Sequence, residues 1–507
     1  MQNKNARCII IFMEKMTNEN VISAGEAQEA LVRERERKQF VKMTQTAIPR
    51  LIISLGIPTT LSMMVTSLYN LADMFFVSLL NDRAATAAAS NLIALMSIIQ
   101  AVGFTFGMGS GSVISRLLGK RDREGADTVF SSSMFISCIC GLLILAFGLL
   151  FLSPLMKLFG AKSVNVMMYS KQYARYILFA APFMCMSFVL NNVLRAEGKA
   201  TLSMIGLIAG AVANVGLDPL LILVFDMGIS GAAIATCFSQ ILSFVILFIM
   251  FLSGKTVVRF RIRAISRKMG VYGEVIATGF PSFCRQILAS LCTVFLNSAA
   301  FDCGVAHYGS VDGGEAAQTA LGVVQKVFML AFSMSLGIGQ GYQPVLGYNY
   351  SAKRFDRVKS AYLFTMFFAM TVMTVFAVCS AILAPYIIHI FDDSLATTEI
   401  GALALRLQCI CMPLLPVNFM ASVTYQVVGN KGLATLLSIS RQGLFYIPAV
   451  LILPEIFGLF GVQSCQALSD LFAFIFALPF MFAFFKTLKK EQAKLEEEKV
   501  DEEPVQA

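Results

Sequence analysis

Two aspartates lie inside apolar stretches of the sequence, where an ionised carboxylate is costly. Asp73 follows Asn70 by three positions and Asp218 follows Asn214 by four, so each pair projects from one face of a helix. Thr236 adds a hydroxyl in the next apolar stretch. Carboxylate, amide and hydroxyl oxygens bind hard cations, and two interacting acids can instead share a proton. We therefore predict a site for a sodium ion or a proton at Asp73, Asn214, Asp218 and Thr236.

A purely structural role is the alternative for these side chains. Polar groups between membrane helices often act as hydrogen-bonding contacts, and the acids would then stay neutral. For the two aspartates we favour function, because Asn or Gln would supply such contacts more simply. The second half of the chain lacks both acids at the equivalent places, so the fold itself does not require them. For Asn70, cavity lining and helix contact are equally open.

The second half of the chain carries basic and amide side chains within its apolar stretches. We expect four of them to line a cavity, with plain packing as the alternative: Arg285, Gln286, Gln325 and Lys326. For Arg406 and Arg441, a side chain that reaches back to the membrane interface is at least as good an interpretation as a functional role. Pro58 and Pro281 interrupt the helical hydrogen bonding at matching places. We predict hinges there, with static kinks as the alternative.

Several function classes lack their machinery in this sequence. Neither a nucleophile with its base nor a metal-ligand set occurs at helix-compatible spacing, so we expect no enzyme and no cofactor. Gly254-Lys255-Thr256 is similar to the end of a phosphate-binding loop, but Ile249 stands where such a loop requires glycine. The net charge of +9 comes from basic residues in short connections, so we expect no nucleic-acid partner.

Composition indicates which elements position these residues. The chain has 507 residues, of which 57% are hydrophobic and 14% charged, and its mean hydropathy is +0.72. Apolar stretches of about 20 residues, enough to cross the hydrocarbon core as a helix, recur along almost its whole length. We predict an all-α membrane protein with twelve transmembrane helices, over residues 47–77, 87–112, 129–154, 172–194, 201–225, 229–252, 273–301, 315–344, 358–390, 399–427, 432–455 and 461–486.

The basic residues indicate how the chain is oriented in the membrane. With a cytoplasmic amino terminus, 31 Lys and Arg fall in cytoplasmic segments, 5 in outer segments and 4 within spans. Such a bias is the usual topology signal of membrane proteins. We therefore predict a multi-pass protein of the plasma membrane with both termini in the cytoplasm.

The two halves of the chain resemble each other. Gly56-Ile57-Pro58 matches Gly279-Phe280-Pro281, and the glycine cluster at 107–111, which is expected to allow close helix packing, matches that at 337–341. Each half holds six spans, which predicts two pseudo-symmetric six-helix bundles that enter the membrane in the same direction. We divide the chain into a solvated N-terminal tail (1–46), a first lobe (47–253), a basic cytoplasmic linker (254–271), a second lobe (272–487) and a solvated C-terminal tail (488–507).

Three stretches together resemble the multidrug and toxic compound extrusion (MATE) family. They are Pro58 with Tyr69-Asn70-Leu71-Ala72-Asp73-Met74-Phe75-Phe76-Val77, the segment Arg195-Ala196-Glu197-Gly198-Lys199-Ala200, and Asn214 to Pro219 followed by Gly228-Ile229-Ser230-Gly231-Ala232-Ala233-Ile234-Ala235-Thr236. The resemblance covers about residues 47–487. It implies a V-shaped pair of bundles that exports bulky, often cationic organic compounds in exchange for sodium ions or protons.

The resemblance also implies roles for particular residues. In related members, the positions of Asp73, Asn214, Asp218 and Thr236 form a cation site in the amino-terminal lobe, and all four residue types are present here. Some branches use an acid in the seventh span, where this chain has Arg285-Gln286. The coupling scheme of those branches is therefore not expected here.

The main hypothesis is a monomeric secondary antiporter that resides in the lipid bilayer and exports small organic molecules. A flippase for lipids or lipid-linked precursors is the alternative from another class. Such proteins usually present a basic cavity for phosphate, so the buried acids of the first half argue against it. A channel is a third hypothesis, which the stoichiometry of countertransport would exclude.

Overall fold

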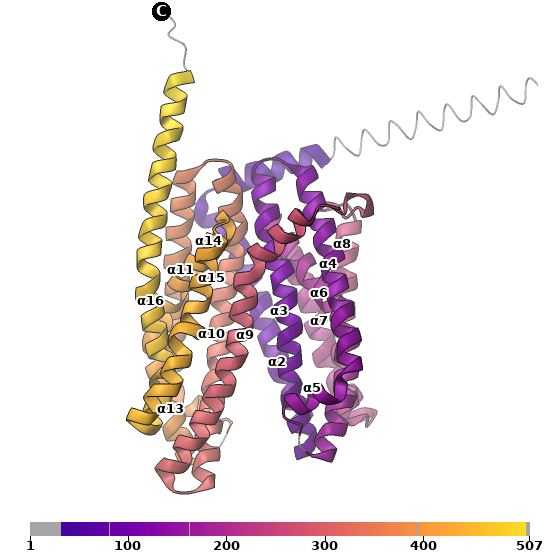
Figure 1. Cartoon of the computed structure of the whole chain (residues 1–507), viewed down its shortest axis with the longest axis vertical. Coiled ribbons are helices and arrows are strands. Elements are labelled where there is room, and N and C mark those ends of the chain that lie inside the picture. Colours follow the sequence, from indigo (N-terminus) through magenta and orange to yellow (C-terminus); the bar gives the residue numbers. More distant parts are fainter. Residues whose placement is uncertain (1–31, 81, 162, 392–393, 503–507) are drawn as a thin grey trace, which may run out of the picture.

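The computed structural model describes residues 32–80, 82–161, 163–391 and 394–502, and this part of the chain is helical and contains no strand (Figure 1). Its helices form two bundles. The first bundle consists of α2 (Ile48–Ser78), α3 (Arg83–Gly119), α4 (Arg123–Leu150), α5 (Leu152–Leu158), α6 (Val164–Ala196), α7 (Ala200–Pro219), a π-helical turn (Leu220–Val224) and α8 (Gly228–Leu252).

The second bundle follows a connection that contains a short 3-10 turn (Ile262–Ala264). It consists of α9 (Met269–Tyr308), α10 (Val311–Ser351), α11 (Phe355–Ile382), α12 (Ala384–His389), α13 (Leu395–Cys411), a 3-10 turn (Met412–Leu414), α14 (Leu415–Val428), α15 (Lys431–Ile439), a π-helical turn (Ser440–Tyr446) and α16 (Ile447–Glu502).

The number of membrane crossings follows from one break in the last helical segment. Among the described residues, 11 helical segments are long and apolar enough to cross a membrane, and the last of them spans Lys431–Glu498. Gly458 has a φ of 55° and a ψ of −134°, so the chain leaves the helical path there. A left-handed φ of this kind favours glycine. The break divides the last segment into two crossings, and twelve transmembrane helices result, as predicted.

Glycines allow the two bundles to touch through their backbones. A Cβ atom on Gly279 of α9 would lie 1.8 Å from the carbonyl oxygen of Thr105 on α3. A Cβ atom on Gly341 of α10 would lie 2.6 Å from the Cα of Gly56 on α2. No larger residue fits such crossings without moving a helix. The glycine cluster 337–341, and Gly279 of the matching tripeptide, therefore lie at the contact between the bundles.

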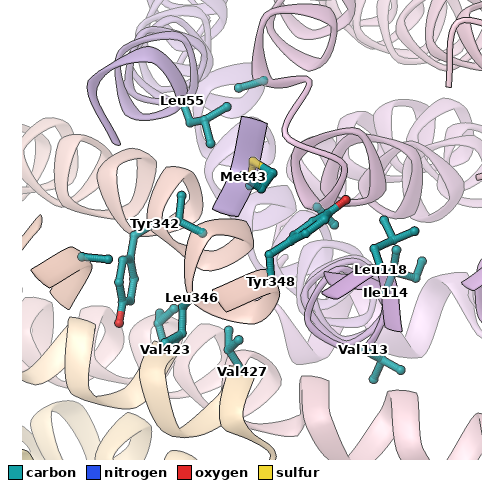
Figure 2. Close-up of a cluster of buried hydrophobic side chains, with 14 of the residues drawn as sticks. Met43, Leu55, Val113, Ile114, Leu118, Tyr342, Leu346, Tyr348, Val423 and Val427 are labelled. Atoms are coloured by element: carbon teal, nitrogen blue, oxygen red, sulfur yellow. The ribbon is translucent and has the colours of Figure 1, made fainter. Parts of the chain in front are cut away.

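These contacts lie toward one end of the bundles. The helix over residues 32–45 and the carboxyl-terminal end of α16 both lie at this end, which we call the terminal face (Figure 1). A hydrophobic cluster joins the bundles there, and it includes Leu55 of α2, Ile114 of α3 and Leu346 of α10. Figure 2 shows Met43, from the helix over 32–45, among these side chains.

The N-terminal tail is more than a solvated segment, which corrects the expectation from its charged sequence. Its residues 1–31 lie outside the described residues, but Val32 and Met43 are completely buried. Gln39 donates a hydrogen bond to the carbonyl of Glu197 in the first bundle. Charged residues dominate the sequence of this helix, but its apolar face packs on the bundles.

The connection between the bundles is held on the first bundle by hydrogen bonds. The buried carboxylate of Glu197 accepts hydrogen bonds from the backbone N–H groups of Val257 at 3.0 Å and Val258 at 2.7 Å. Asp127 accepts a third, from the N–H of Arg259, at 2.7 Å. These bonds satisfy backbone donors that no regular element covers.

Candidate functional site

The polar residues of α7 meet α8 inside the first bundle. Asn214 and Asp218 lie one helical turn apart and are 1% and 0% exposed. The side-chain N–H2 of Asn214 donates to the Oδ1 of Asp218 and to the hydroxyl of Thr236, both at 3.3 Å. Pro219 follows at once and leads into the π-helical turn Leu220–Val224, so the regular helix ends beside the site. The structure thus brings three of the four predicted residues together.

The fourth residue, Asp73, reaches the same place from α2. The hydroxyl of Tyr173 on α6 donates to the Oδ2 of Asp73 at 3.1 Å. Thr236 and Asp218 lie near the Asp73 carboxylate. Four helices of one bundle therefore contribute to a single polar cluster, which we call the N-lobe cluster: Asp73, Tyr173, Asn214, Asp218 and Thr236.

Three oxygens of the N-lobe cluster are buried and have no hydrogen-bond donor. They are the Oδ1 of Asp73, the Oδ1 of Asn214 and the Oδ2 of Asp218. Buried acceptors without partners are uncommon, because each forfeits its hydration. A cation or a proton between these oxygens would remove that cost. The donor set consists of hard oxygen ligands, which suits sodium better than a transition metal.

A second layer of polar side chains borders the N-lobe cluster. Gln240 of α8 donates to the hydroxyl of Tyr69 at 3.2 Å, and Tyr69 lies near Asp73 and Asp218. Asn70, its neighbour on α2, is partly exposed. Tyr173 was missed from the sequence, because its distance along the chain from the acids hides that it faces them. Tyr69 was also missed, although it lies four residues before Asp73 on the same helix and its spacing could have revealed it.

The basic and amide residues of the second half are spread over different places. Lys326 of α10 lines a cavity of about 330 Å³ together with Leu71 of α2 and apolar residues of α11 and α12. Gln286 of α9 donates to the Oε1 of Gln100 on α3 at 3.3 Å, and so connects the bundles. Gln325 donates to the hydroxyl of Thr293 at 3.3 Å.

Arg285 lies in a second, smaller cavity inside the second bundle, beside Arg441. The guanidinium of Arg441 donates from Nε to the Oδ1 of Asp470 at 2.6 Å, and both residues are buried. Arg441 therefore does not reach back to the membrane interface, contrary to the interpretation of its sequence context. Arg406 is exposed.

Both candidate hinge prolines lie inside helices where the bundles touch. Pro58 interrupts α2, and the hydroxyl of the next residue, Thr59, donates to the carbonyl of Gly337 on α10 at 2.7 Å. Pro281 interrupts α9 two residues after Gly279, which packs on α3. Bending at these places would change the contact between the bundles, so the hinge role stays a prediction with a suitable location.

Comparison with known protein families decides the identity of the fold. The family model described as MatE matches residues 58–220 and 281–452, which is more than half of the chain and covers both halves. The chain belongs to the MatE family. Members of this family are transporters rather than enzymes, and they need no cofactor.

Two relatives of this MatE chain carry the name multidrug export protein MepA. The protein from Staphylococcus aureus is 26% identical over 428 residues, covering 84% of this chain and 91% of the relative. The protein from Staphylococcus saprophyticus is 24% identical over 461 residues, covering 90% of this chain and 99% of the relative.

Solved structures agree with this placement. One is described as the outward-facing conformation of a multidrug resistance MATE family transporter, and it matches with a TM-score of 0.82 and 28% identity, covering 89% of this chain and 98% of the other. A transporter of the MOP superfamily from Pyrococcus furiosus matches with a TM-score of 0.82 and 27% identity, covering 89% and 99%. The resemblance inferred from the sequence motifs is thus confirmed.

Asp470 is a buried acid in the second bundle of this MatE chain that the sequence analysis missed. It lies within an apolar stretch of α16, is 2% exposed and pairs with Arg441. The signal that selected Asp73 and Asp218, an acid inside an apolar stretch, was present at Asp470 as well. Applying it to the second half would have found Asp470, although not its partner Arg441.

Proposed function

We propose that the chain is a secondary antiporter of the plasma membrane that exports bulky, cationic organic compounds in exchange for sodium ions or protons. The observation that carries the proposal is the N-lobe cluster, with buried oxygens of Asp73, Asn214 and Asp218 that lack donors. A site built from such oxygens gains a cation or a proton at little cost in rearrangement. The multidrug export function in the names of both relatives supports the type of cargo.

The terminal face is cytoplasmic in this proposal. Lys and Arg are concentrated in the segments at that face, in agreement with the usual bias of membrane proteins. The lobes, 47–253 and 272–487, are in contact near the terminal face, so the described arrangement corresponds to the state closed toward the cytoplasm. The linker 254–271 and the tails 1–46 and 488–507 then lie in the cytoplasm, and one copy of the chain suffices for transport.

Coupling follows if the ion and the cargo favour different states. Asp73 belongs to α2, which carries Pro58 and touches the second lobe, whereas Asn214 and Asp218 belong to α7. An ion bound between α2 and α7 therefore stabilises one position of α2 against the rest of its bundle. Such differential binding shifts the equilibrium toward the state that releases cargo.

The test is efflux of a fluorescent cationic dye from proteoliposomes under a sodium gradient or a proton gradient, imposed separately. We expect one gradient to accelerate efflux, and Asp73→Asn and Asp218→Asn to reduce that acceleration to the level of protein-free liposomes. Asp356→Asn, at an exposed aspartate in the first turn of α11, is the matched control and should behave as wild type. Gradient-driven efflux at the wild-type rate in both cluster variants would refute the proposal.

A further inference from the structure

The segment from Arg195 to Ala200 joins α6 to α7, and the N-lobe cluster makes no use of it. Its first residue, Arg195, is only 3% exposed. The Nε of Arg195 donates to the hydroxyl of Ser203 on α7 at 3.1 Å, and its Nη1 donates to the Oε1 of Gln340 on α10. Ser203 belongs to the same lobe as Arg195, whereas Gln340 belongs to the glycine cluster 337–341 of the other lobe. Arg195 is therefore buried at the contact between the lobes.

The positive charge of Arg195 has no counter-charge in this contact. Arg195 forms no ion pair with a carboxylate among the described residues, and the Glu197 carboxylate is already used. It pairs with Lys199 at 2.7 Å and accepts hydrogen bonds from the backbone N–H groups of Val257 and Val258. The Nη2 of Arg195 is also buried and has no acceptor. Because a guanidinium stays charged at physiological pH, it cannot relieve this burial by losing a proton.

The acceptors that Arg195 finds are too few to replace its hydration. A guanidinium has five N–H donors, and one hydroxyl and one neutral amide oxygen accept from only two of its three nitrogens. A buried cation with neither a counter-charge nor a full set of acceptors destabilises the arrangement that buries it. When the lobes separate at the terminal face, α10 moves away from Arg195 and water can reach the guanidinium. Separation thus restores the hydration that closure removes.

We propose that Arg195 is a positioning residue of the transport cycle, whose buried and unpaired charge destabilises the closed contact between the lobes and keeps the separated state accessible. The glycine crossings and the hydrophobic cluster at the terminal face favour closure, and Arg195 opposes them. A transporter needs this balance, because a cycle stops when one of its states is too stable to leave. The inference rests on the proposed antiport only in that the lobes must separate at this face.

Deuterium exchange on the full chain in nanodiscs, without an ion gradient, measures the proposed effect. Residues 337–349 of α10 are buried at the lobe contact, so their amides become accessible when the lobes separate. The double variant Arg195→Met with Gln340→Met replaces the charge and its acceptor by apolar side chains of similar length. We expect exchange at 337–349 to be about tenfold slower in this variant than in wild type, because removal of an unpaired buried charge stabilises closure.

Single variants separate the effect of the charge from that of the hydrogen bond. Gln340→Met removes an acceptor and leaves the charge buried, so exchange at 337–349 should be faster than in wild type. Arg195→Lys keeps the charge and should exchange more like wild type than like the double variant. Arg175→Met, at an exposed arginine of α6, is the matched control and should exchange as wild type does. Amides at 173–185 of α6, inside the first lobe, should exchange equally in all variants and so report an intact fold.

Three results would overturn the inference. Faster exchange at 337–349 in the double variant than in wild type would make Arg195 a bond that holds the lobes together, and equal exchange would give its charge no effect. Slower exchange of wild type in sodium chloride than in sodium gluconate, absent from the double variant, would assign the guanidinium to a bound anion. Because no gradient is applied, these outcomes do not depend on ion coupling. Dye efflux that ignores both gradients, together with the expected exchange rates, would instead contradict the proposed antiport.

Discussion

The side-chain amide of Asn349 donates a hydrogen bond to the backbone carbonyl of Met43 at 3.0 Å. This bond ties the helix over residues 32–45 to α10 of the second lobe, while Gln39 of the same helix is bonded to the carbonyl of Glu197 in the first. Figure 2 shows the Met43 side chain near Leu55 and Tyr348, one from each lobe. The helix therefore holds both lobes together across the terminal face.

Truncation of Met43 should loosen this closure. Met43→Ala leaves a gap at a completely buried position, and such changes cost about 2–5 kcal/mol. We expect the closed arrangement of the terminal face to be less stable by a free energy of this size. Amides in the last turns of α10 should then exchange with deuterium faster than in wild type. Lys38→Ala, on the exposed side of the same helix, is the control. Unchanged exchange in Met43→Ala would show that the helix does not seal the lobes.

The backbone contact at Gly279 provides a second test of the closure. A methyl group there would meet the carbonyl of Thr105 at 1.8 Å, so Gly279→Ala must push α9 away from α3. Overpacking of this kind costs about 1–3 kcal/mol, which corresponds to a slowing of dye efflux by roughly 5- to 150-fold if closure is required in the cycle. Gly273→Ala, on the same helix, meets no atom within 4 Å and should transport as wild type.

Efflux by Gly279→Ala at the wild-type rate would mean that transport does not require the close contact between α9 and α3 at this crossing. A defect shared by Gly273→Ala would point instead to a general effect of alanine on α9. The two glycines differ in their surroundings and not in their helical conformation, so the comparison isolates the contact between lobes.

The sequence was sufficient for the fold because its signals are local. Apolar stretches, loop charges and matching tripeptides such as Gly56-Ile57-Pro58 each need only a short window. The pairing of Asn214 with Asp218 was equally accessible, since residues four apart share a helix face. The convergence of Asp73 on the same place was inferred from its cost in hydrocarbon and from the family resemblance.

What the sequence could not provide depends on how helices are rotated against each other. Tyr173 donates to Asp73 from 100 positions away along the chain, and nothing in its own segment marks it as facing an acid. The helix over residues 32–45 was likewise hidden, because its charged residues dominate the composition of its segment. Its role follows from partners in distant segments, such as Asn349.

The buried ion pair of the second lobe leads to a prediction about stability. Asp470→Asn leaves the charge of Arg441 buried without a counter-charge, which costs about 3–5 kcal/mol. We expect a clearly lower melting temperature in detergent, and recovery of most of the loss in the double variant Asp470→Asn with Arg441→Gln. Glu498→Gln removes a pair with Lys353 whose side chains are 68% and 65% exposed, and it should change stability by less than about 0.5 kcal/mol.

Two results would contradict this account of the ion pair. A double variant no more stable than Asp470→Asn alone would mean that lost packing, rather than an unpaired charge, causes the damage. An effect of Glu498→Gln as large as that of Asp470→Asn would mean that burial does not set the size of the loss.

Glu274 forms two ion pairs at the terminal face, and one of them connects the lobes. Its Oε1 accepts a hydrogen bond from Arg116 of α3 at 2.9 Å, and its Oε2 pairs with Lys431 of its own lobe. The Glu274 side chain is 38% exposed, so solvent screens both pairs, and each contributes no more than about 1 kcal/mol. Glu274→Gln should therefore change the equilibrium between closed and separated lobes at this face by a few-fold, in favour of separation, and it should not abolish transport.

Ionic strength distinguishes this charge contact from apolar packing. Salt weakens partly exposed ion pairs, so deuterium exchange at the terminal-face end of α9 should quicken with added salt in wild type. In Glu274→Gln, deuterium exchange at this end of α9 should already be fast and should respond little to salt. The control Glu315→Gln, at an exposed glutamate in the first part of α10, should keep the salt response of wild type. An undiminished salt response in Glu274→Gln would mean that charges other than Glu274 produce it, whereas a wild type without any salt response would assign the closure to the glycine crossings and Met43, because those contacts carry no net charge for salt to screen.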